Sequence, residues 1–122
     1  MAHVLDWFEL PVTDFARAKA FYEAVLGRSV TRMDMGGITL GMLGSDADSV
    51  GGALVCGEGN VPSSTGSLVY LNGGEDLAIM LARVEAAGGR ILVPKTDIGQ
   101  GFGFFAHFLD CEGNKVGLHS MG

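Results

Sequence analysis

Positive charge is scarce in this chain of 122 residues, and it is not gathered in one place. Eight lysines and arginines stand against 14 aspartates and glutamates, which gives a formal net charge of -6. Proteins that bind nucleic acid through its phosphates carry a clustered basic surface. The basic residues here are scattered between Arg17 and Lys115. The sequence therefore argues against nucleic acid as a partner.

Long apolar runs are missing too. Although 48% of the residues are hydrophobic, every apolar stretch is interrupted well short of the roughly 20 residues that span a bilayer. The first residues, 1–6, show no basic region followed by an apolar run and a small-residue cleavage site, which a secretory signal would have. We therefore expect no membrane-spanning segment, no membrane partner and a cytoplasmic location.

Cysteine is rare, with only Cys56 and Cys111 present and no CxxC spacing. In a reducing compartment, two isolated cysteines are expected to be free thiols rather than a disulfide. Neither has a basic neighbour in the sequence that would mark it as an activated nucleophile.

The chain contains the same pattern twice. A strand-like run at Trp7–Val12 leads into a helix-like run that closes at Gly27, and Leu68–Asn72 leads into a second one that closes at Gly89. Short strand-like runs punctuated by glycine follow each helix. This duplication predicts two βαβββ modules around a shared cavity. The expected later strands are 29–34, 38–43 and 52–56 in the first half and 90–94, 102–109 and 115–119 in the second.

Capping residues and apolar spacing place both helices. Thr13 or Asp14 can cap the first helix, and Gly27 can end it in a left-handed conformation. Glu75 and Asp76 are expected in the first turn of the second helix, which would end at Gly88-Gly89. The helical spacing predicts buried faces of Phe15, Ala18, Tyr22 and Val25 in the first helix and Leu77, Met80, Leu81 and Val84 in the second.

We expect one α+β domain covering residues 1–122, because this length suits a single compact core. Module one would cover about residues 1–57 and module two about residues 67–122. Residues 58–66, which are rich in turn-forming residues, would be the linker. The segment Asp97–Gly103 contains three glycines and is expected to form a mobile flap over the cavity.

Both ends of the chain resemble a known superfamily. The run Trp7–Asp14 and the helix end Phe21–Gly27 are similar to the opening of the glyoxalase/bleomycin-resistance/extradiol-dioxygenase superfamily, also called vicinal oxygen chelate proteins. The run Phe108–Leu118 resembles its final hairpin, an Asp-x-x-Gly-Asn turn followed by a strand. The resemblance covers essentially the whole chain. It implies two βαβββ modules that form a U-shaped half-barrel cavity, commonly completed in a homodimer.

The resemblance also implies ligands for a divalent cation on the first and last strands of each module. The corresponding positions here are Trp7, then Leu68 or Val69, and Gly117, while strand 52–56 offers no carboxylate or imidazole. A cation needs several oxygen or nitrogen donors that converge on one point. We therefore expect no metal cofactor at the inherited site.

A relocated divalent metal is the alternative. Its donors would be Glu9, His119 and His107, which come from three strands without a supporting spacing.

Strand alternation identifies the side chains that are expected to face the cavity. If Phe8 and Leu10 pack under the first helix, Trp7 and Glu9 on the same strand face the cavity. The same alternation applies to the first and last strands of module two. The implied topology makes those two strands parallel neighbours. The residues expected to share one pocket are Trp7, Glu9, Tyr70, Asn72 and His119.

Three of these residues are candidates for catalysis. Glu9 would act as a general base if burial raised its pKa, or it would be an exposed residue at a sheet edge. Tyr70 or His119 would steady an enolate oxygen. For His119, which lies close to the end of the sequence, a packing role is the alternative.

The remaining candidates would contact a ligand. Trp7 suits either a stacking platform or a plug for the lost metal site. Asn72 offers a polar anchor, Phe104 an aromatic contact, and His107, which lies among aromatic residues, either a rim contact or a structural hydrogen bond.

Two functions follow from these residues. The first is a glyoxalase-like protein that binds a small organic molecule in an apolar cavity without the metal, as a resistance-type protein would. The alternative is a glyoxalase-type lyase or isomerase that transfers a proton next to a carbonyl, with Glu9 as base or with a relocated metal. A cavity plugged by its own aromatic residues would instead favour an assembly subunit. The expected partners are a small-molecule ligand and a second copy of the chain.

Overall fold

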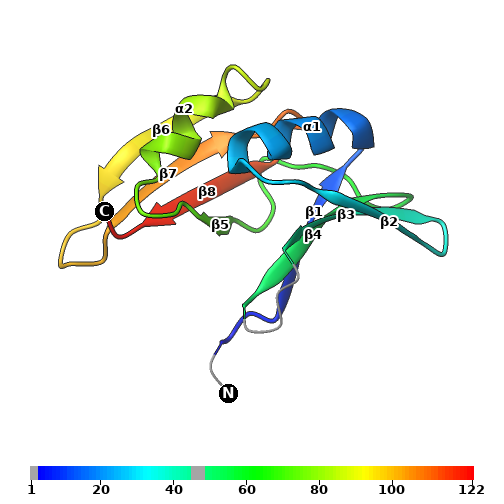
Figure 1. Cartoon of the computed structure of the whole chain (residues 1–122), viewed down its shortest axis with the longest axis horizontal. Coiled ribbons are helices and arrows are strands. Elements are labelled where there is room, and N and C mark those ends of the chain that lie inside the picture. The colour runs from blue at the N-terminus through cyan, green and yellow to red at the C-terminus, as the bar shows by residue number, and fades with distance from the viewer. Residues whose placement is uncertain (1–2, 45–48) are drawn as a thin grey trace.

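The computed structural model describes residues 3–44 and 49–122 and contains the βαβββ pattern twice (Figure 1). This confirms the predicted α+β class and the two βαβββ modules. The first module comprises β1 (Trp7–Val12), α1 (Phe15–Leu26), β2 (Thr31–Met35), β3 (Ile38–Gly44) and β4 (Gly51–Cys56). The second comprises β5 (Val69–Asn72), α2 (Ala78–Val84), β6 (Arg90–Asp97), β7 (Phe104–Leu109) and β8 (Lys115–Ser120).

Each module forms a separate four-stranded sheet, with strand orders β1-β4-β3-β2 and β5-β8-β7-β6. In both sheets the first and last strands of the module run parallel, whereas the other pairs are antiparallel. The two helices contact each other and cover one side of the molecule (Figure 1). Each sheet therefore has a helix-covered face and an opposite face, which we call its free face.

The ends of α1 lie at the predicted capping residues, whereas α2 is shorter than predicted. Asp14 caps α1 by accepting a hydrogen bond from the Arg17 amide at 3.1 Å, and Gly27 ends the helix with φ 69°. α2 begins only at Ala78, so Asp76 precedes the helix and accepts hydrogen bonds from the Ala78 amide and Lys95 Nζ. Among the described residues, no helix is both long and apolar enough to cross a membrane.

The core lies between the helices and the covered faces of the sheets. Alternation works as expected on β1, because Leu10 and Val12 are buried and Phe8 packs against the core, whereas Trp7 and Glu9 are exposed. The fully buried side chains that come from the helices, from the residue before α2 and from β4, β7 and β8 include Phe21, Tyr22, Val25, Leu77, Val84, Leu54, Phe108, Val116 and Leu118.

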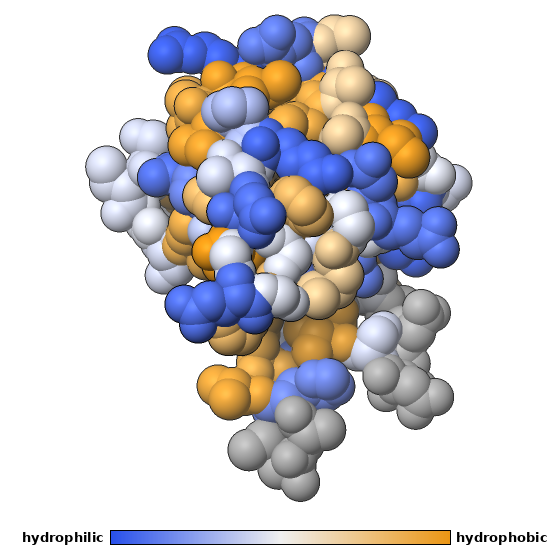
Figure 2. Space-filling model, turned by 90° about the vertical axis from the view of Figure 1, so that its left-hand side faces the viewer, coloured by the Kyte–Doolittle hydropathy of each residue, from blue (hydrophilic) through white to orange (hydrophobic). Residues whose placement is uncertain are grey.

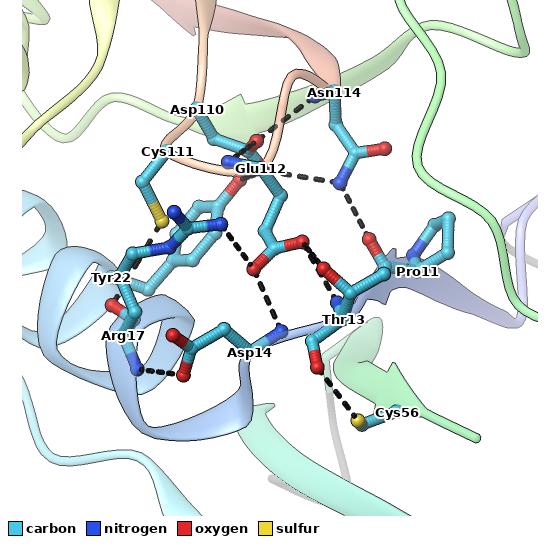
Figure 3. A network of polar contacts seen from close by, with 10 residues as sticks. All are labelled: Pro11, Thr13, Asp14, Arg17, Tyr22, Cys56, Asp110, Cys111, Glu112 and Asn114. Atoms are coloured by element: carbon cyan, nitrogen blue, oxygen red, sulfur yellow. Dashed lines mark hydrogen bonds and ion pairs between the residues drawn. The ribbon is translucent and has the colours of Figure 1, made fainter.

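A buried carboxylate joins the two modules (Figure 3). Glu112, in the turn between β7 and β8, has a side chain that is only 1% exposed. It accepts hydrogen bonds from the amide and hydroxyl of Thr13 at 2.8 and 2.7 Å, from the Asp14 amide at 2.9 Å and from Arg17 Nη2 at 2.9 Å. Burial opposes ionisation, yet the hydrogen bonds from Thr13, Arg17 and Asp14 lower the pKa of Glu112 to about 2. A negative charge from module two therefore sits at the N-terminus of α1, where it is favoured.

The same turn makes a second set of contacts across the joint. The buried Tyr22 hydroxyl donates to Asp110 Oδ2 at 2.6 Å, and burial raises the Tyr22 pKa well above its ordinary value. Asn114 Nδ2 donates to the Pro11 carbonyl at 2.7 Å, while Asn114 Oδ1 accepts from the Ser63 amide at 3.1 Å. The predicted turn at 110–114 thus holds β1, α1 and the connecting segment together.

Both cysteines are free, as predicted. Cys56 Sγ lies 3.6 Å from the Thr13 carbonyl oxygen, and Cys111 Sγ lies 3.8 Å from that of Arg17. Burial raises the pKa of Cys111 to about 11, so this thiol is unreactive at neutral pH.

Candidate functional site

A cavity of about 990 Å³ opens on the free face of the second module. β5 contributes Tyr70 and Asn72, β7 contributes Phe105 and β8 contributes His119. Ile98 from the loop after β6 and Met121 near the chain end add apolar surface. Figure 2, in which the left-hand side of Figure 1 faces the viewer, shows apolar residues at the surface, interspersed with polar ones. The cavity is thus an apolar space with a few polar side chains, which is the usual composition of a small-molecule site.

Strand pairing arranges these side chains in two rows across the sheet. Asn72 pairs with His119, and His119 pairs with Phe105, so these three form one row over β5, β8 and β7. Tyr70, Gly117 and His107 form the neighbouring row. Tyr70 and His119 therefore line one cavity, as alternation predicted.

Trp7 and Glu9 lie on the other sheet. Within the described chain, only residues of the second module line the 990 Å³ cavity. Glu9 lines a smaller cavity of about 160 Å³ at the junction of the modules, together with Ser63 and Lys115. The expectation that all five residues share one pocket therefore needs correction, because the two modules form separate sheets. Glu9 is also exposed. The burial that was expected to raise its pKa and make it a general base is therefore absent at this residue.

Tyr70 and His107 form a hydrogen-bonded pair. The Tyr70 hydroxyl lies 2.7 Å from His107 Nε2. Burial, and secondarily the charge of Lys115, lower the pKa of His107 below its ordinary value. The imidazole therefore favours its neutral form, in which Nε2 either accepts a hydrogen bond from the tyrosine hydroxyl or donates one to its oxygen.

Of two adjacent phenylalanines, the structure places Phe105 in the cavity. Phe104 packs against the core on the helix-covered side, where Lys95 Nζ lies 4.4 Å from its ring centroid. Phe105 was not among the predicted site residues, although a signal for it existed. Alternation from His107 assigns residue 105, rather than 104, to the cavity face.

An aromatic side chain lies beside a glycine where the superfamily resemblance expects metal ligands. A Cβ atom added to Gly117 would lie 2.4 Å from Cδ1 of the Tyr70 ring. In the first module, Trp7 pairs with Gly51, and a Cβ there would lie 3.0 Å from Trp7 Cζ3. Tyr70 thus fills the space that a larger residue at position 117 would need.

The residues present do not fit a divalent cation. Trp7, Leu68 and Gly117 carry no side chain that can bind a metal. Of the two candidates at 68 and 69, alternation from Tyr70 assigns Leu68 to the cavity face. In the parts of the chain that the structure describes, no cluster of three or more His, Cys, Asp or Glu residues could hold a metal ion. The alternative donors Glu9, His107 and His119 do not converge, since Glu9 lies on the other sheet.

The loop between β6 and β7 borders the cavity at the predicted flap. Asp97 ends β6 and accepts a hydrogen bond from the Gly99 amide at 2.7 Å. The Ile98 amide donates to the Gly103 carbonyl at 2.9 Å, which closes the loop. His119 Nε2 lies 2.7 Å from the Phe102 carbonyl oxygen, so β8 holds this loop, residues 98–103, which we call the flap.

The whole architecture matches a known protein class. The family model of the Glyoxalase/Bleomycin resistance protein/Dioxygenase superfamily matches residues 4–118. The chain belongs to this superfamily, which confirms the resemblance of its two ends. No curated protein matches the sequence.

Solved structures of similar fold include several glyoxalases. A mutant glyoxalase I from Zea mays has a TM-score of 0.74 and 27% identity, with 95% of this chain and 46% of that chain covered. A glyoxalase/bleomycin resistance protein from Albidiferax ferrireducens has a TM-score of 0.72 and 16% identity, with 95% and 98% covered. Glyoxalase I from Leishmania major has a TM-score of 0.69 and 20% identity, with 98% and 88% covered. The chain spans about half the length of the maize protein.

Proposed function

We propose that this protein binds a small organic molecule in the cavity of its second module, without the metal of its metal-dependent relatives. The volume of about 990 Å³ lies at the upper end of the usual range for ligand sites, roughly 300–1,000 Å³. Tyr70 and Phe105 offer aromatic surface, while His119 and Asn72 offer polar anchors.

The observation that carries this proposal is the position of Tyr70 beside Gly117. A residue with a Cβ at position 117 would collide with the Tyr70 ring, so an aromatic surface takes the space of an inherited ligand. An aromatic face stacks on planar ligands, whereas it offers no lone pair to a divalent cation. The Tyr70 ring in place of a metal-binding side chain at position 117 therefore favours organic ligands over a metal-bound substrate.

The alternative is a glyoxalase-type lyase or isomerase that transfers a proton next to a carbonyl. The Tyr70–His107 pair favours it, because a tyrosine hydroxyl bonded to a neutral imidazole can exchange a proton with a bound oxygen. Glu9 lies outside this cavity, so it would act as the base only if a second copy supplied it. A relocated metal receives no support from the positions of Glu9, His107 and His119.

We also propose that a second copy of the chain covers the free face of the first module. This face exposes Trp7 by 37%, Met33 by 45% and Met35 by 54%, and Ile38 and Met42 extend the apolar surface. Contiguous exposed apolar surface of this kind marks interaction sites. A dimer would also reach the size of maize glyoxalase I, of which one chain spans about half.

The dimer is tested by adding charge to this face. In sedimentation experiments we expect the unchanged protein to be a dimer and Met35→Glu to weaken dimerisation at least about 10-fold, because a carboxylate would be buried without a partner. The matched control is Ile79→Glu, since Ile79 is 59% exposed on α2 and lies away from this face. A monomeric unchanged protein, or equal dissociation by the control, would contradict the proposal.

Ligand binding is tested with 2-naphthol, a planar aromatic alcohol that fits a cavity of this size. We expect saturable binding, measured by its fluorescence, and a loss of affinity of about 10-fold in Phe105→Ala, because truncation removes the aromatic surface under the ring. Ile79→Ala, which changes an exposed residue outside the cavity, is expected to bind like the unchanged protein. Binding that ignores Phe105 would place the ligand elsewhere.

A further inference from the structure

The hydrogen bond between His119 and the flap determines which ring nitrogen carries the proton. Nε2 lies 2.7 Å from the carbonyl oxygen of Phe102. A carbonyl oxygen can only accept a hydrogen bond, so Nε2 must carry the hydrogen. In the neutral ring, Nδ1 then keeps its lone pair and can only accept.

This lone pair is available to a ligand. Among the described residues, Nδ1 of His119 has no hydrogen-bond partner, and the ring lines the cavity. His107 differs, because its Nε2 is already paired with the Tyr70 hydroxyl. The cavity therefore contains one free imidazole acceptor, and the tautomer of its neutral ring is fixed by the contact with the Phe102 carbonyl.

We propose that His119 is a specificity-determining residue whose Nδ1 accepts a hydrogen bond from a hydroxyl group of the ligand. This inference rests on the proposed binding function of the cavity and names its ligand class, planar apolar molecules with a phenolic or enolic hydroxyl. The row Phe105, His119 and Asn72 supports it. Neighbouring side chains on one face of a sheet lie about 5 Å apart. A ligand whose aromatic ring packs on Phe105 therefore places its hydroxyl group at His119.

Asn72 supplies the opposite polarity on the other side of His119. Its Oδ1 accepts a hydrogen bond from the Gly74 amide at 2.9 Å, so its Nδ2 is left as the donor toward the cavity. A ligand oxygen that donates to His119 Nδ1 can accept from Asn72 Nδ2. A hydroxyl satisfies both contacts, whereas an ether oxygen can only accept.

The test compares 2-naphthol with 2-methoxynaphthalene, which has the same ring system but no hydroxyl hydrogen. The unchanged protein is expected to prefer the alcohol by roughly 3- to 10-fold, the usual worth of one neutral hydrogen bond. His119→Asn keeps an acceptor at the position of Nδ1 and should retain most of this preference. His119→Gln keeps only a group at the position of Nε2 and should lose it.

Hydrogen exchange of the flap separates the two nitrogens independently of the ligand. His119→Gln can still donate to the Phe102 carbonyl, so exchange at the Ile98 and Phe102 amides should stay slow. His119→Asn loses this contact, and exchange there should accelerate.

The outcomes distinguish this inference from the proposal beneath it. Equal affinity of the unchanged protein for the alcohol and the ether would overturn the role of Nδ1 while leaving the binding cavity intact. A preference that survives in His119→Gln would also overturn it. If neither compound binds, the cavity proposal itself fails and the inference fails with it.

Discussion

Replacing Glu112 with alanine is expected to lower the free energy of unfolding by about 3 kcal/mol, because hydrogen bonds to a charged group contribute about 1.5–3 kcal/mol and several are lost together. The carboxylate accepts hydrogen bonds from the amides of Thr13 and Asp14, the Thr13 hydroxyl and Arg17 Nη2. Its removal leaves the start of α1 without these acceptors and removes one of the two sets of contacts that join the modules. Urea denaturation measures the change.

Glu58→Ala is the matched control, because Glu58 is exposed in the segment between the modules. Exposed positions of this kind usually change stability by less than about 0.5 kcal/mol. A loss of stability in Glu112→Ala no larger than in the control would contradict the role of the joint.

The same carboxylate gives the stability a pH dependence of known sign. The pKa of Glu112 is lowered from 4.5 to about 2 in the folded protein. Its contribution is therefore fully present above pH 4.5 and is lost as the pH falls from there toward 2. Over this window the unchanged protein should lose more stability than Glu112→Gln, which has no carboxylate to protonate.

Introducing a carboxylate at position 117, as in Gly117→Glu, is expected to destabilise the protein by about 1–3 kcal/mol, the usual cost of overpacking. Its Cβ would meet the Tyr70 ring at 2.4 Å, so the ring must leave its place and its bond to His107 must break. One added carboxylate also leaves the other metal positions without donors. We therefore expect no stoichiometric divalent ion in elemental analysis of this variant.

A double variant tests whether Tyr70 causes the cost. In Tyr70→Ala/Gly117→Glu most of the lost stability should return, because the ring that collides with the new side chain is gone. Gly44→Glu is the control on β3, since, apart from the glycine's chain neighbours, no atom of the residues that the structure describes lies within 4 Å of a Cβ added there. A single Gly117→Glu variant as stable as the unchanged protein would show that Tyr70 does not fill this space.

The fold could be predicted because each module carries its own local signals. Asp14 and Gly27 mark the ends of α1, and the alternation of Leu10 and Val12 gives the covered face of β1. Both ends of α2 were predicted less well: it begins at Ala78 rather than at Glu75-Asp76, and it ends at Val84 rather than at Gly88-Gly89. The turn after Val84 also depends on tertiary contacts. Gly89 donates to the Val84 carbonyl at 2.9 Å and packs against Phe21 from the other module.

The site could be predicted only within one module. Alternation correctly oriented Tyr70, Asn72 and His119, because it depends on a single strand at a time. It could not show that Trp7 and Glu9 lie on a separate sheet, since strand pairing joins β1 to β4 and β5 to β8 but joins neither pair to the other. The cytoplasmic location, the module boundaries and the mobility of the flap remain predictions.

The pairings of His107 and His119 were also beyond the sequence. Tyr70 and His107 are 37 residues apart, and Phe102 and His119 are 17 residues apart. Both contacts arise only when β5, β7 and β8 are assembled. They nevertheless determine which ring nitrogens a ligand can use.

The most direct test of a metal-free organic site is a 2-naphthol titration before and after dialysis against a chelator, with the bound position mapped by NMR. We predict the same dissociation constant in both states and chemical-shift changes centred on Tyr70, Phe105 and His119. Binding that disappears with the chelator and returns with a divalent ion would contradict the account, as would shifts confined to the first module.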